Sequence, residues 1–175
     1  MTTNNWYVIT GAPSAGKSTI ITELAKRGYV TVEEYGRKLI DQGLASGKTL
    51  AQINVDSPEF ELAWIELQHR GEATTNTATA TFFDRGIIDT LAYFAYYNWP
   101  IPDRVTELCK HSTYKKVFLL EILDYKQDYA RIESAETAHA MQQLFGKVYR
   151  DAGYEVIFIK RDTVENRLEE IIKSL

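Results

Sequence analysis

Short apolar stretches alternate with longer amphipathic ones along the whole chain. Five of the short stretches are rich in β-branched and aromatic residues, and several are almost continuously apolar, which is typical of strands covered on both faces. The five predicted strands are Trp6–Thr10, Tyr29–Val32, Thr79–Phe83, Lys116–Leu120 and Glu155–Ile159.

The amphipathic stretches between these strands predict helices. An apolar stripe over Leu39–Leu44 indicates one helix. A second stripe, over Phe60–Leu67, follows Ser57 and Pro58, which suit an N-cap and the first helical position. The threonine-rich run Thr74–Thr81 is interpreted as the end of a helix leading into a strand. Strands that alternate with helices predict an α/β fold with a parallel sheet and helices on both faces.

The segment Asp124–Arg150 is long, charged and helical in period, with several apolar residues on one side. It follows the fourth predicted strand, where many nucleotide kinases carry a lid. We expect this segment to fold over a bound ligand, with the lid itself around residues 124–135.

Length and composition predict a single domain over residues 1–175. A chain of 175 residues with 45% hydrophobic and 12% aromatic residues can bury one full core. The 20 Lys and Arg against 24 Asp and Glu leave a net charge of −4. This balance argues against nucleic acid or an anionic membrane as a partner, so any basic site is expected to be local.

The cysteine and histidine content argues against disulfides and structural zinc. Cys109 is the one cysteine, interpreted as a small packed residue, and the three histidines lack metal-ligand spacing. The apolar runs are shorter than the ~20 residues of a membrane-spanning helix. The amino-terminal residues also lack the features of a signal peptide, so we expect a cytoplasmic location.

Residues 11–18, GAPSAGKS, match the phosphate-loop pattern G-x-x-x-x-G-K-[ST] at every fixed position. A predicted strand precedes them and Thr19–Leu24 continues as a helix. Backbone N–H groups of such a loop converge on phosphate oxygens, and the following helix adds the positive end of its dipole. The predicted nucleotide-binding residues are Gly11, Ala12, Pro13, Ser14, Ala15, Gly16, Lys17, Ser18 and Thr19.

Two side chains of this loop have predicted chemical roles toward ATP. Lys17 is expected to reach the β- and γ-phosphates, and the Ser18 hydroxyl to bind Mg²⁺. A chance match in a strand-to-helix turn is the alternative. A second Gly-Lys-Thr at residues 47–49 has its upstream glycine one residue too close and follows a helical pattern, so we interpret it as a loop. The glycine spacing also disfavours a dinucleotide-binding Rossmann site.

Asp84 follows the third predicted strand, where the second magnesium-associated carboxylate of P-loop proteins belongs. It can order a metal-bound water or accept a proton from an attacking hydroxyl, and it is our first choice for a catalytic carboxylate. The alternative is an Asp that caps a helix beginning near Ile87, and the two roles can coexist.

Glu34 and Arg37 follow the second predicted strand, at the edge of the sheet where ligands of α/β proteins gather. They would lie one helical turn apart and could both point toward an acceptor. The alternative is an ion pair on the protein surface between residues i and i+3.

Lys126 and Arg131 lie in the predicted lid and can neutralise charge on a transferring phosphoryl group. A solvated helix face is the alternative for such charges. The aromatic residues over Tyr93–Trp99 could stack on a base, but they share helical spacing without interleaved basic residues, so we interpret them as core.

The segments GAPSAGKS, EYGR, FFDRGIIDTLAYF, YKQDYARIE and GYEVIFI occur in this order over nearly the whole chain. The set resembles a family of small P-loop proteins described as AAA-type ATPase domains and related to the nicotinamide riboside kinase domain. The resemblance implies a three-layer P-loop NTPase fold whose five-stranded parallel sheet has the kinase-like order 2-3-1-4-5. It also implies functional roles for Glu34, Arg37, Gln68, Asp84, Arg85, Asp89, Asp128 and Arg131.

The predicted chemistry depends on some of these residues and on two residues of the phosphate loop. Lys17, Asp84 and Arg131 form the predicted catalytic set, and Ser18 and Asp84 the predicted Mg²⁺ ligands. Acceptor binding is assigned to Glu34, Arg37, Arg85 and Asp89.

The leading functional hypothesis is a Mg²⁺-dependent phosphotransferase that moves the γ-phosphoryl of ATP to a small nucleoside-like or ribosyl acceptor. The alternative is an AAA-type regulatory ATPase that couples hydrolysis to a partner interaction. The sequence contains neither the N-K-x-D nor the D-x-x-G motif, which argues against a GTP-driven switch. It also has no basic stripe, which argues against a polynucleotide 5′-end kinase.

Overall fold

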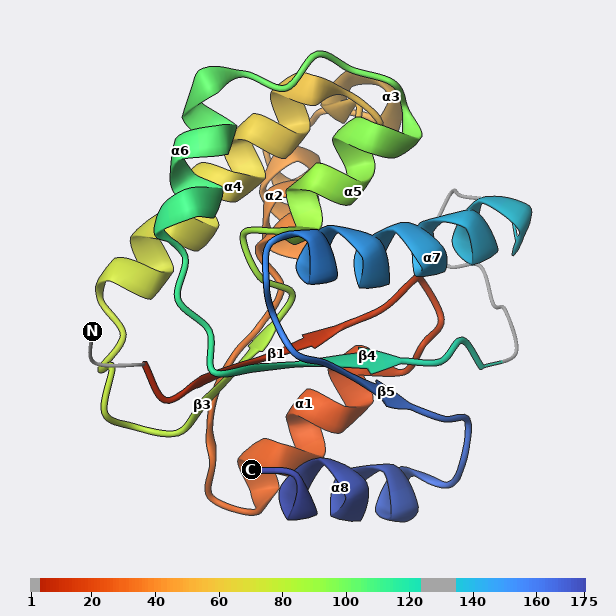
Figure 1. The fold of residues 1–175 in the computed structure, drawn as a ribbon. Helices are drawn as coiled ribbons and strands as arrows, with labels where there is room; N and C mark the ends of the chain where they lie inside the picture. The colour runs from red at the N-terminus through yellow and green to blue at the C-terminus, as the bar shows by residue number, and fades with distance from the viewer. Residues whose placement is uncertain (1–3, 124–134) are drawn as a thin grey trace.

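A five-stranded, wholly parallel sheet forms the centre of the molecule (Figure 1). The structure is a computed structural model that describes residues 4–123 and 135–175. The strand order β2-β3-β1-β4-β5 confirms the predicted topology. The strands are β1 (Trp6–Thr10), β2 (Val30–Val32), β3 (Thr81–Asp84), β4 (Lys116–Leu120) and β5 (Val156–Ile159).

Each predicted strand is present, with its ends within two residues of the predicted ones. The largest shift is at β3, which begins at Thr81 instead of Thr79 and ends at Asp84 instead of Phe83. β1 is buried along its entire length, because it lies between β3 and β4 and is covered on both faces. Its almost continuous apolar character follows from this position.

Helices of the described residues connect and flank the strands. They are α1 (Lys17–Lys26), α2 (Tyr35–Ala45), α3 (Leu50–Ile53), α4 (Pro58–Ala73), α5 (Asp89–Tyr96), α6 (Asp103–His111), α7 (Ala135–Asp151) and α8 (Val164–Lys173). The apolar stripes predicted α2 and α4. The helix predicted over Asp124–Arg150 is present as α7, and the remaining part of that prediction lies outside the described residues.

The start of α4 agrees with the pattern in the sequence. Ser57 is the N-cap, and its hydroxyl oxygen accepts a hydrogen bond from the Phe60 N–H at 3.2 Å. Pro58 is the first helical residue, where its missing N–H has no consequence. The helix ends at Ala73, so the following threonine-rich run forms the connection to β3.

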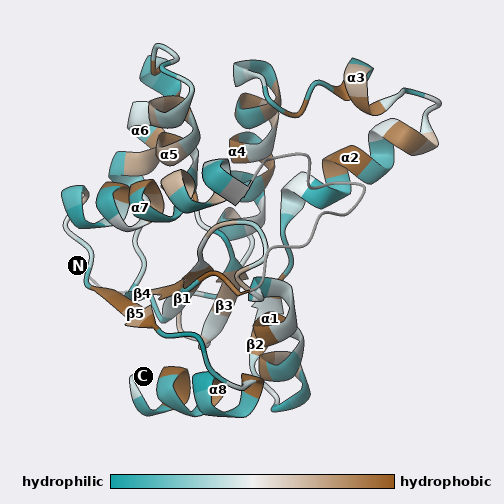
Figure 2. Cartoon of the chain, turned by 90° about the vertical axis from the view of Figure 1, so that its right-hand side faces the viewer, coloured by the Kyte–Doolittle hydropathy of each residue, from teal (hydrophilic) through white to brown (hydrophobic). Residues whose placement is uncertain are grey.

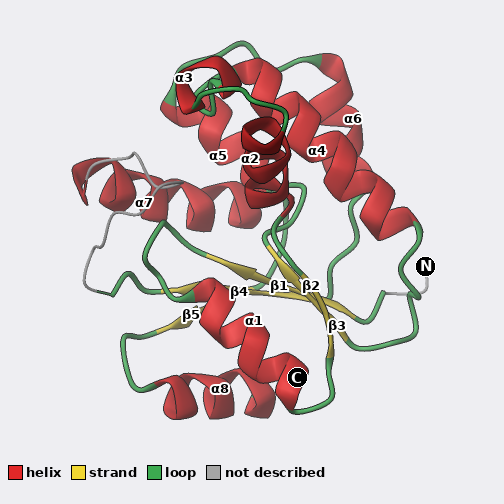
Figure 3. Ribbon diagram, turned by 180° about the vertical axis from the view of Figure 1, so that it is seen from behind, coloured by secondary structure: helices red, strands yellow, loops and turns green. Residues whose placement is uncertain are grey.

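Helices cover both faces of the sheet, as predicted (Figures 1 and 3). On one face, Tyr7 and Ile9 of β1 pack in a core cluster with residues of α1 and α8. On the other face, Trp6 and Val8 pack with residues that include Tyr149 of α7. This alternation is the two-residue period of a strand, and Figure 2 shows brown strands between helices with mixed faces.

No helix within the described ranges, 4–123 and 135–175, combines the length and the apolar character needed to cross a membrane.

Candidate nucleotide and acceptor site

The phosphate loop joins β1 to α1 at the carboxyl end of the central strand. Gly11 and Gly16 adopt φ angles of 143° and 83°, which side chains rarely allow. A Cβ atom at Gly11 would also lie 2.7 Å from the carbonyl oxygen of Leu120 in β4. Both fixed glycines of the motif are therefore required by the backbone path.

Lys17 is buried and folds back along the loop. Its Nζ donates hydrogen bonds to the carbonyl oxygens of Gly11 at 2.9 Å and Ala12 at 3.1 Å. Burial and the positive charge of Arg85 lower the pKa of Lys17 to about 8, although Asp84 and Glu34 act in the opposite direction. The ammonium group is held at the mouth of the loop, in the position from which it can serve phosphate oxygens.

Gln142 of α7 fixes the first half of the loop. Its Oε1 accepts a hydrogen bond from the Ala12 N–H at 3.0 Å, and its Nε2 donates to the Leu120 carbonyl oxygen at 2.9 Å. The side chain is 7% exposed. It thereby ties the loop to β4 and α7.

Arg167 of α8 fixes the second half. Its Nη1 donates to the Ala15 carbonyl oxygen at 2.9 Å, and its Nη2 donates to the Glu121 carbonyl oxygen at 3.2 Å. Neither Gln142 nor Arg167 was identified from the sequence. Their partners lie 130 and 152 residues away, so no local spacing could reveal them.

Ser18 and Asp84 meet beside the loop, where Ser18 Oγ donates to Asp84 Oδ2 at 3.1 Å. Asp84 is paired with Ile9 in the register of β3 on β1, which places its carboxylate next to the phosphate loop. Its Oδ1 is buried and has no hydrogen-bond partner among the described residues. Because α5 begins only at Asp89, Asp84 does not cap a helix at this point.

The hydroxyl and carboxylate oxygens of this pair fit Mg²⁺, which prefers hard oxygen ligands and binds beside phosphates. The unpartnered Oδ1 of Asp84 leaves a carboxylate oxygen for such a cation or its water. Burial and the nearby Glu34 raise the pKa of Asp84 to about 6, against the opposing charges of Lys17 and Arg85.

Glu34 and Arg85 form an ion pair across the site, with Arg85 Nε 2.8 Å from Glu34 Oε1. Glu34 immediately precedes α2 and Arg85 immediately follows β3. Burial alone would raise the pKa of Glu34, but Arg85 and Lys17 hold it below its ordinary value. Glu34 thus pairs with a residue inside the site, whereas the sequence left open a surface pair with Arg37.

The Arg85 guanidinium lies over two aromatic rings, at 4.9 Å from the centre of Phe145 and 5.7 Å from that of Tyr93. Its backbone has a φ angle of 73°, which is unusual for a residue with a side chain. Gln68, which the resemblance singled out, donates from Nε2 to the Arg85 carbonyl oxygen at 3.3 Å. Gln68 therefore supports the backbone that carries Arg85.

Asp89 is completely buried behind this pair. It accepts hydrogen bonds from the Thr10 hydroxyl, from the Gly86 N–H at 2.7 Å and from Tyr149 Oη at 2.9 Å. Arg85 Nη1 lies 3.7 Å from its Oδ1. The sequence predicted an acceptor contact for Asp89, but its side chain is not part of the pocket lining and instead holds the Arg85 loop against β1 and α7.

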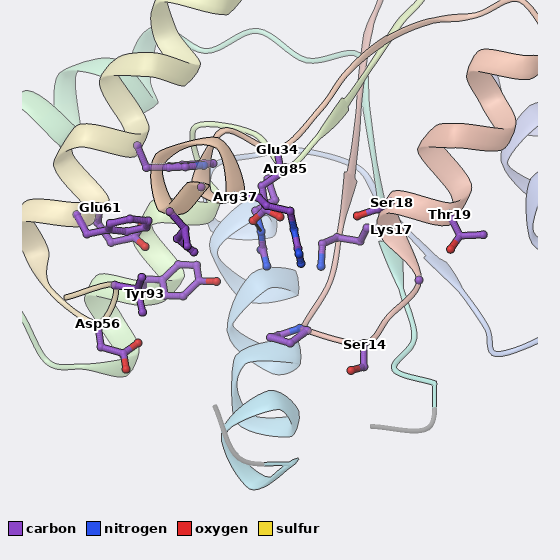
Figure 4. Close-up of a pocket in the computed structure, with 17 residues that line it drawn as sticks. Ser14, Lys17, Ser18, Thr19, Glu34, Arg37, Asp56, Glu61, Arg85 and Tyr93 are labelled. Carbon is purple, nitrogen blue, oxygen red and sulfur yellow. Dashed lines mark hydrogen bonds and ion pairs between the residues drawn. The ribbon is translucent and has the colours of Figure 1, made fainter. Parts of the chain in front are cut away.

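A cavity of about 140 Å³ opens from the phosphate loop toward α2 and α4 (Figure 4). At the loop end it is lined by Pro13, Ser14, Gly16, Lys17, Ser18 and Thr19. At the other end it is lined by Ile40, Val55, Asp56, Phe60, Glu61, Trp64 and Tyr93, with Glu34, Arg37 and Arg85 also contributing. The predicted loop residues Gly11, Ala12 and Ala15 lie outside this lining, and the two alanines are buried.

The aromatic segment over Tyr93–Trp99 is divided between core and pocket. Phe94 is fully buried and packs edge-to-face on Trp99 with 5.6 Å between ring centres, which confirms the core interpretation there. Tyr93 lines the cavity instead. Because both residues belong to α5, the helical spacing indicated packing but could not show which ring faces the pocket. Cys109 packs against core clusters on the same side of the sheet.

Lys126, Asp128 and Arg131 lie outside the described residues, together with most of the predicted lid. Their roles stay predictions.

Known structures share this fold. A thymidylate kinase from Ehrlichia chaffeensis has a TM-score of 0.69 at 16% identity, with 97% of each chain covered. A deoxyadenosine kinase from M. mycoides has a TM-score of 0.66 at 16% identity, again with 97% of each chain covered. The NadR protein in complex with NR has a TM-score of 0.71 at 16% identity over 97% of this chain and 49% of NadR.

These likenesses establish a P-loop kinase fold. A comparison of the sequence with curated proteins finds no match. A family model described as "AAA domain" matches residues 6–167, which is most of the chain. The protein therefore belongs to this family of AAA domains, as its order of motifs indicated.

Proposed function

We propose that the protein is a Mg²⁺-dependent kinase that transfers the γ-phosphoryl group of ATP to a hydroxyl of a small nucleoside-like or ribosyl acceptor. The observation that carries this proposal is the single cavity that runs from Lys17 and Ser18 to a recess lined by Phe60, Trp64 and Tyr93. A site for phosphates thus continues directly into a recess with the aromatic and polar lining of a small-molecule pocket.

The residues of the loop end bind and orient the triphosphate. The loop backbone and Lys17 hold the phosphates, while Ser18 and Asp84 hold Mg²⁺. When bound, Mg²⁺ neutralises charge that develops on the phosphoryl oxygens. Arg131 of the predicted lid is proposed to supply a further positive charge when both substrates are present.

The two carboxylates take different roles in this proposal. Asp84 accepts a hydrogen bond from Ser18 and is absent from the cavity lining, whereas Glu34 is part of that lining. Glu34 is also kept ionised by Arg85 and Lys17, so it can accept a proton at neutral pH. We therefore assign the acceptor hydroxyl to Glu34 and the metal to Asp84, which revises our first choice of Asp84 as the proton acceptor.

The names of similar structures agree with this reaction class. They include a thymidylate kinase, a deoxyadenosine kinase and NadR in complex with NR. The present chain spans about half of the NadR chain. Arg37 lines the same cavity and is proposed to contact the acceptor.

The test is incubation of the protein with γ-labelled ATP and a panel of nucleosides and ribosyl compounds in the presence of Mg²⁺. Transfer of label to an acceptor, lost in K17A, supports the kinase. Release of label only as inorganic phosphate across the panel would overturn it in favour of an ATPase.

A further inference from the structure

Glu61 is a buried carboxyl in the cavity that the proposed chemistry does not use. It lies in the first turn of α4, is 6% exposed, and lines the cavity. Its Oε2 has no hydrogen-bond partner among the described residues. Burial of an oxygen without a hydrogen-bond partner destabilises the protein unless a ligand or water binds it. Its presence at a cavity wall therefore points to a ligand.

The position of Glu61 places it away from the phosphates. Figure 4 shows Glu61 on the side of the cavity opposite Lys17 and Ser18, beyond Glu34 and Arg85. A group that contacts Glu61 therefore belongs to the part of the acceptor farthest from the phosphoryl group.

The surroundings of Glu61 suit a flat ring. Phe60 and Trp64 of α4 and Tyr93 of α5 line the same cavity. Aromatic side chains of this kind pack on the face of a planar heterocycle and leave its edge for a polar group. Glu61 is the buried carboxyl available at that edge, because Glu34 is paired with Arg85 and is assigned to the acceptor hydroxyl.

The charge state of Glu61 limits which hydrogen-bonding groups a bound ring can present to its carboxyl. Burial raises its pKa to about 8, with the charges of Asp89 and Glu34 acting in the same direction and with Arg85 and the neighbouring Thr90 hydroxyl acting against them. At neutral pH the group is mainly an uncharged carboxylic acid, which offers one O–H donor and one acceptor oxygen. It can therefore form two adjacent hydrogen bonds with a group that has the complementary pair.

We propose that Glu61 recognises the donor–acceptor edge of an uncharged planar heterocycle, of the nucleobase class, in the acceptor. This inference rests on the proposed function and names the part of the acceptor that the cavity selects. The ring packs among Phe60, Trp64 and Tyr93, and its amide-like or amidine-like edge pairs with the Glu61 carboxyl.

The test compares E61Q, E61M and the control E59Q, which removes an exposed carboxyl from the same turn of α4. Binding of adenosine, guanosine, cytidine, uridine and ribose is measured by calorimetry with ADP and Mg²⁺ present, and label transfer is measured in parallel. The amide of E61Q keeps one donor and one acceptor, so it should retain nucleoside affinity within about tenfold. E61M should weaken the preferred nucleoside by about 5- to 150-fold, since it leaves the polar edge unpaired.

The affinities of E61Q and E61M for ribose and ADP should equal those of the wild type. E59Q should bind nucleosides as the wild type does. The melting temperature of E61M should be equal to or above that of the wild type, because the substitution replaces a carboxyl whose buried Oε2 has no hydrogen-bond partner with an apolar side chain. A fall in melting temperature without a change in nucleoside affinity would mean that Glu61 is structural and would overturn the inference.

Two binding results also overturn the inference: no nucleoside binds, or ribose binds as tightly as every nucleoside. An equal loss of nucleoside affinity in E61Q and E61M overturns it as well, because this result indicates an ionised carboxylate that faces a cation. Glu61-dependent binding without label transfer would support the subsite and reject the kinase. Label transfer that is insensitive to E61M would support the kinase and reject the subsite.

Discussion

Arg85 donates from Nε to Glu34 Oε1 over 2.8 Å and so joins the end of β3 to the start of α2 at the middle of the cavity. The Arg85 side chain is almost completely buried and the Glu34 side chain is partly exposed, with side-chain exposures of 6% and 27%. The pair thereby keeps a carboxylate ionised between the proposed phosphate end and the proposed acceptor end of the cavity.

E34Q should lower kcat/KM for the acceptor by on the order of 10² or more, because it removes the proposed proton acceptor. ATP affinity should change little, since Glu34 contributes no phosphate ligand. Steady-state kinetics with the acceptor and calorimetry with ATP measure the two effects. E33Q is the matched control, because Glu33 is the exposed neighbour whose carboxylate faces Lys38. Unchanged acceptor kinetics in E34Q would exclude this role.

K17A should abolish most ATP affinity or turnover while the protein remains folded, because Nζ contacts the loop carbonyl oxygens and not the apolar core. Calorimetric titration with ATP, together with a melting curve, checks both parts. K26A, in the last turn of the same helix, provides the comparison. ATP binding and turnover equal to wild type would contradict the phosphate-loop assignment.

D84N should shift the Mg²⁺ dependence of activity to higher concentration, because the amide is a weaker ligand for a hard cation than the carboxylate beside Ser18. A titration of activity against Mg²⁺ measures the shift. Recovery at excess Mg²⁺ supports coordination by Asp84. A defect that persists at every Mg²⁺ concentration would instead indicate proton transfer or positioning by this residue.

Q142A should destabilise the protein and weaken ATP binding together. The substitution leaves the Ala12 N–H and the Leu120 carbonyl without their side-chain partner. Each unpaired buried group costs about 1–3 kcal/mol. Q143A, which changes the adjacent exposed glutamine, should have almost no effect on either property. Urea unfolding and calorimetry compare the pair, and equal behaviour of the two variants would show that Gln142 does not hold the loop.

Glu72 should make stability fall as pH rises from about 4.5 to 7. This buried carboxyl accepts hydrogen bonds from Tyr114 Oη at 2.6 Å and Gln68 Nε2 at 2.8 Å, and burial raises its pKa to about 7. In the window between the unfolded and folded pKa values the folded state binds more protons, so its stability decreases with pH. The contribution is of the order of 3 kcal/mol at most.

Urea unfolding at a series of pH values measures this slope. E72Q keeps an oxygen that can accept the same hydrogen bonds and should show a shallower decrease than the wild type. Glu61, with a raised pKa of about 8, acts in the same direction in both proteins, so the comparison isolates Glu72. An identical slope in E72Q would refute the assignment.

The strands and the position of Asp84 could be predicted because they depend on local patterns, whereas the order of the strands in the sheet was implied by the family resemblance. Apolar stretches mark the strands, and an acid directly after a strand lies at the sheet edge near the phosphate loop. Glu61 could not be recognised in this way, because a glutamate in the first turn of a helix is ordinary at a solvated helix start. Its burial comes from how α4 packs, which is a tertiary property.

Gln142 and Asp89 illustrate the same limit. Gln142 lies in an amphipathic helix where a polar residue predicts exposure, yet it reaches the loop of β1. Asp89 shares a motif with Arg85, but its hydrogen bonds to Thr10 and Tyr149 turn it away from the cavity. Such partners are far apart in sequence and only the packed fold brings them together.

Because Arg167 contacts the loop, α8 contributes to the proposed nucleotide site. Removal of the segment from Val164 onward would take away the two hydrogen bonds that Arg167 donates to Ala15 and Glu121. It would also uncover the face of α1 on which Leu168 and Ile171 pack. A shortened protein of this kind would carry an intact GAPSAGKS sequence, so a motif search would identify it as an ATP-binding protein. Its phosphate loop would nevertheless lack the hydrogen bonds that Arg167 supplies.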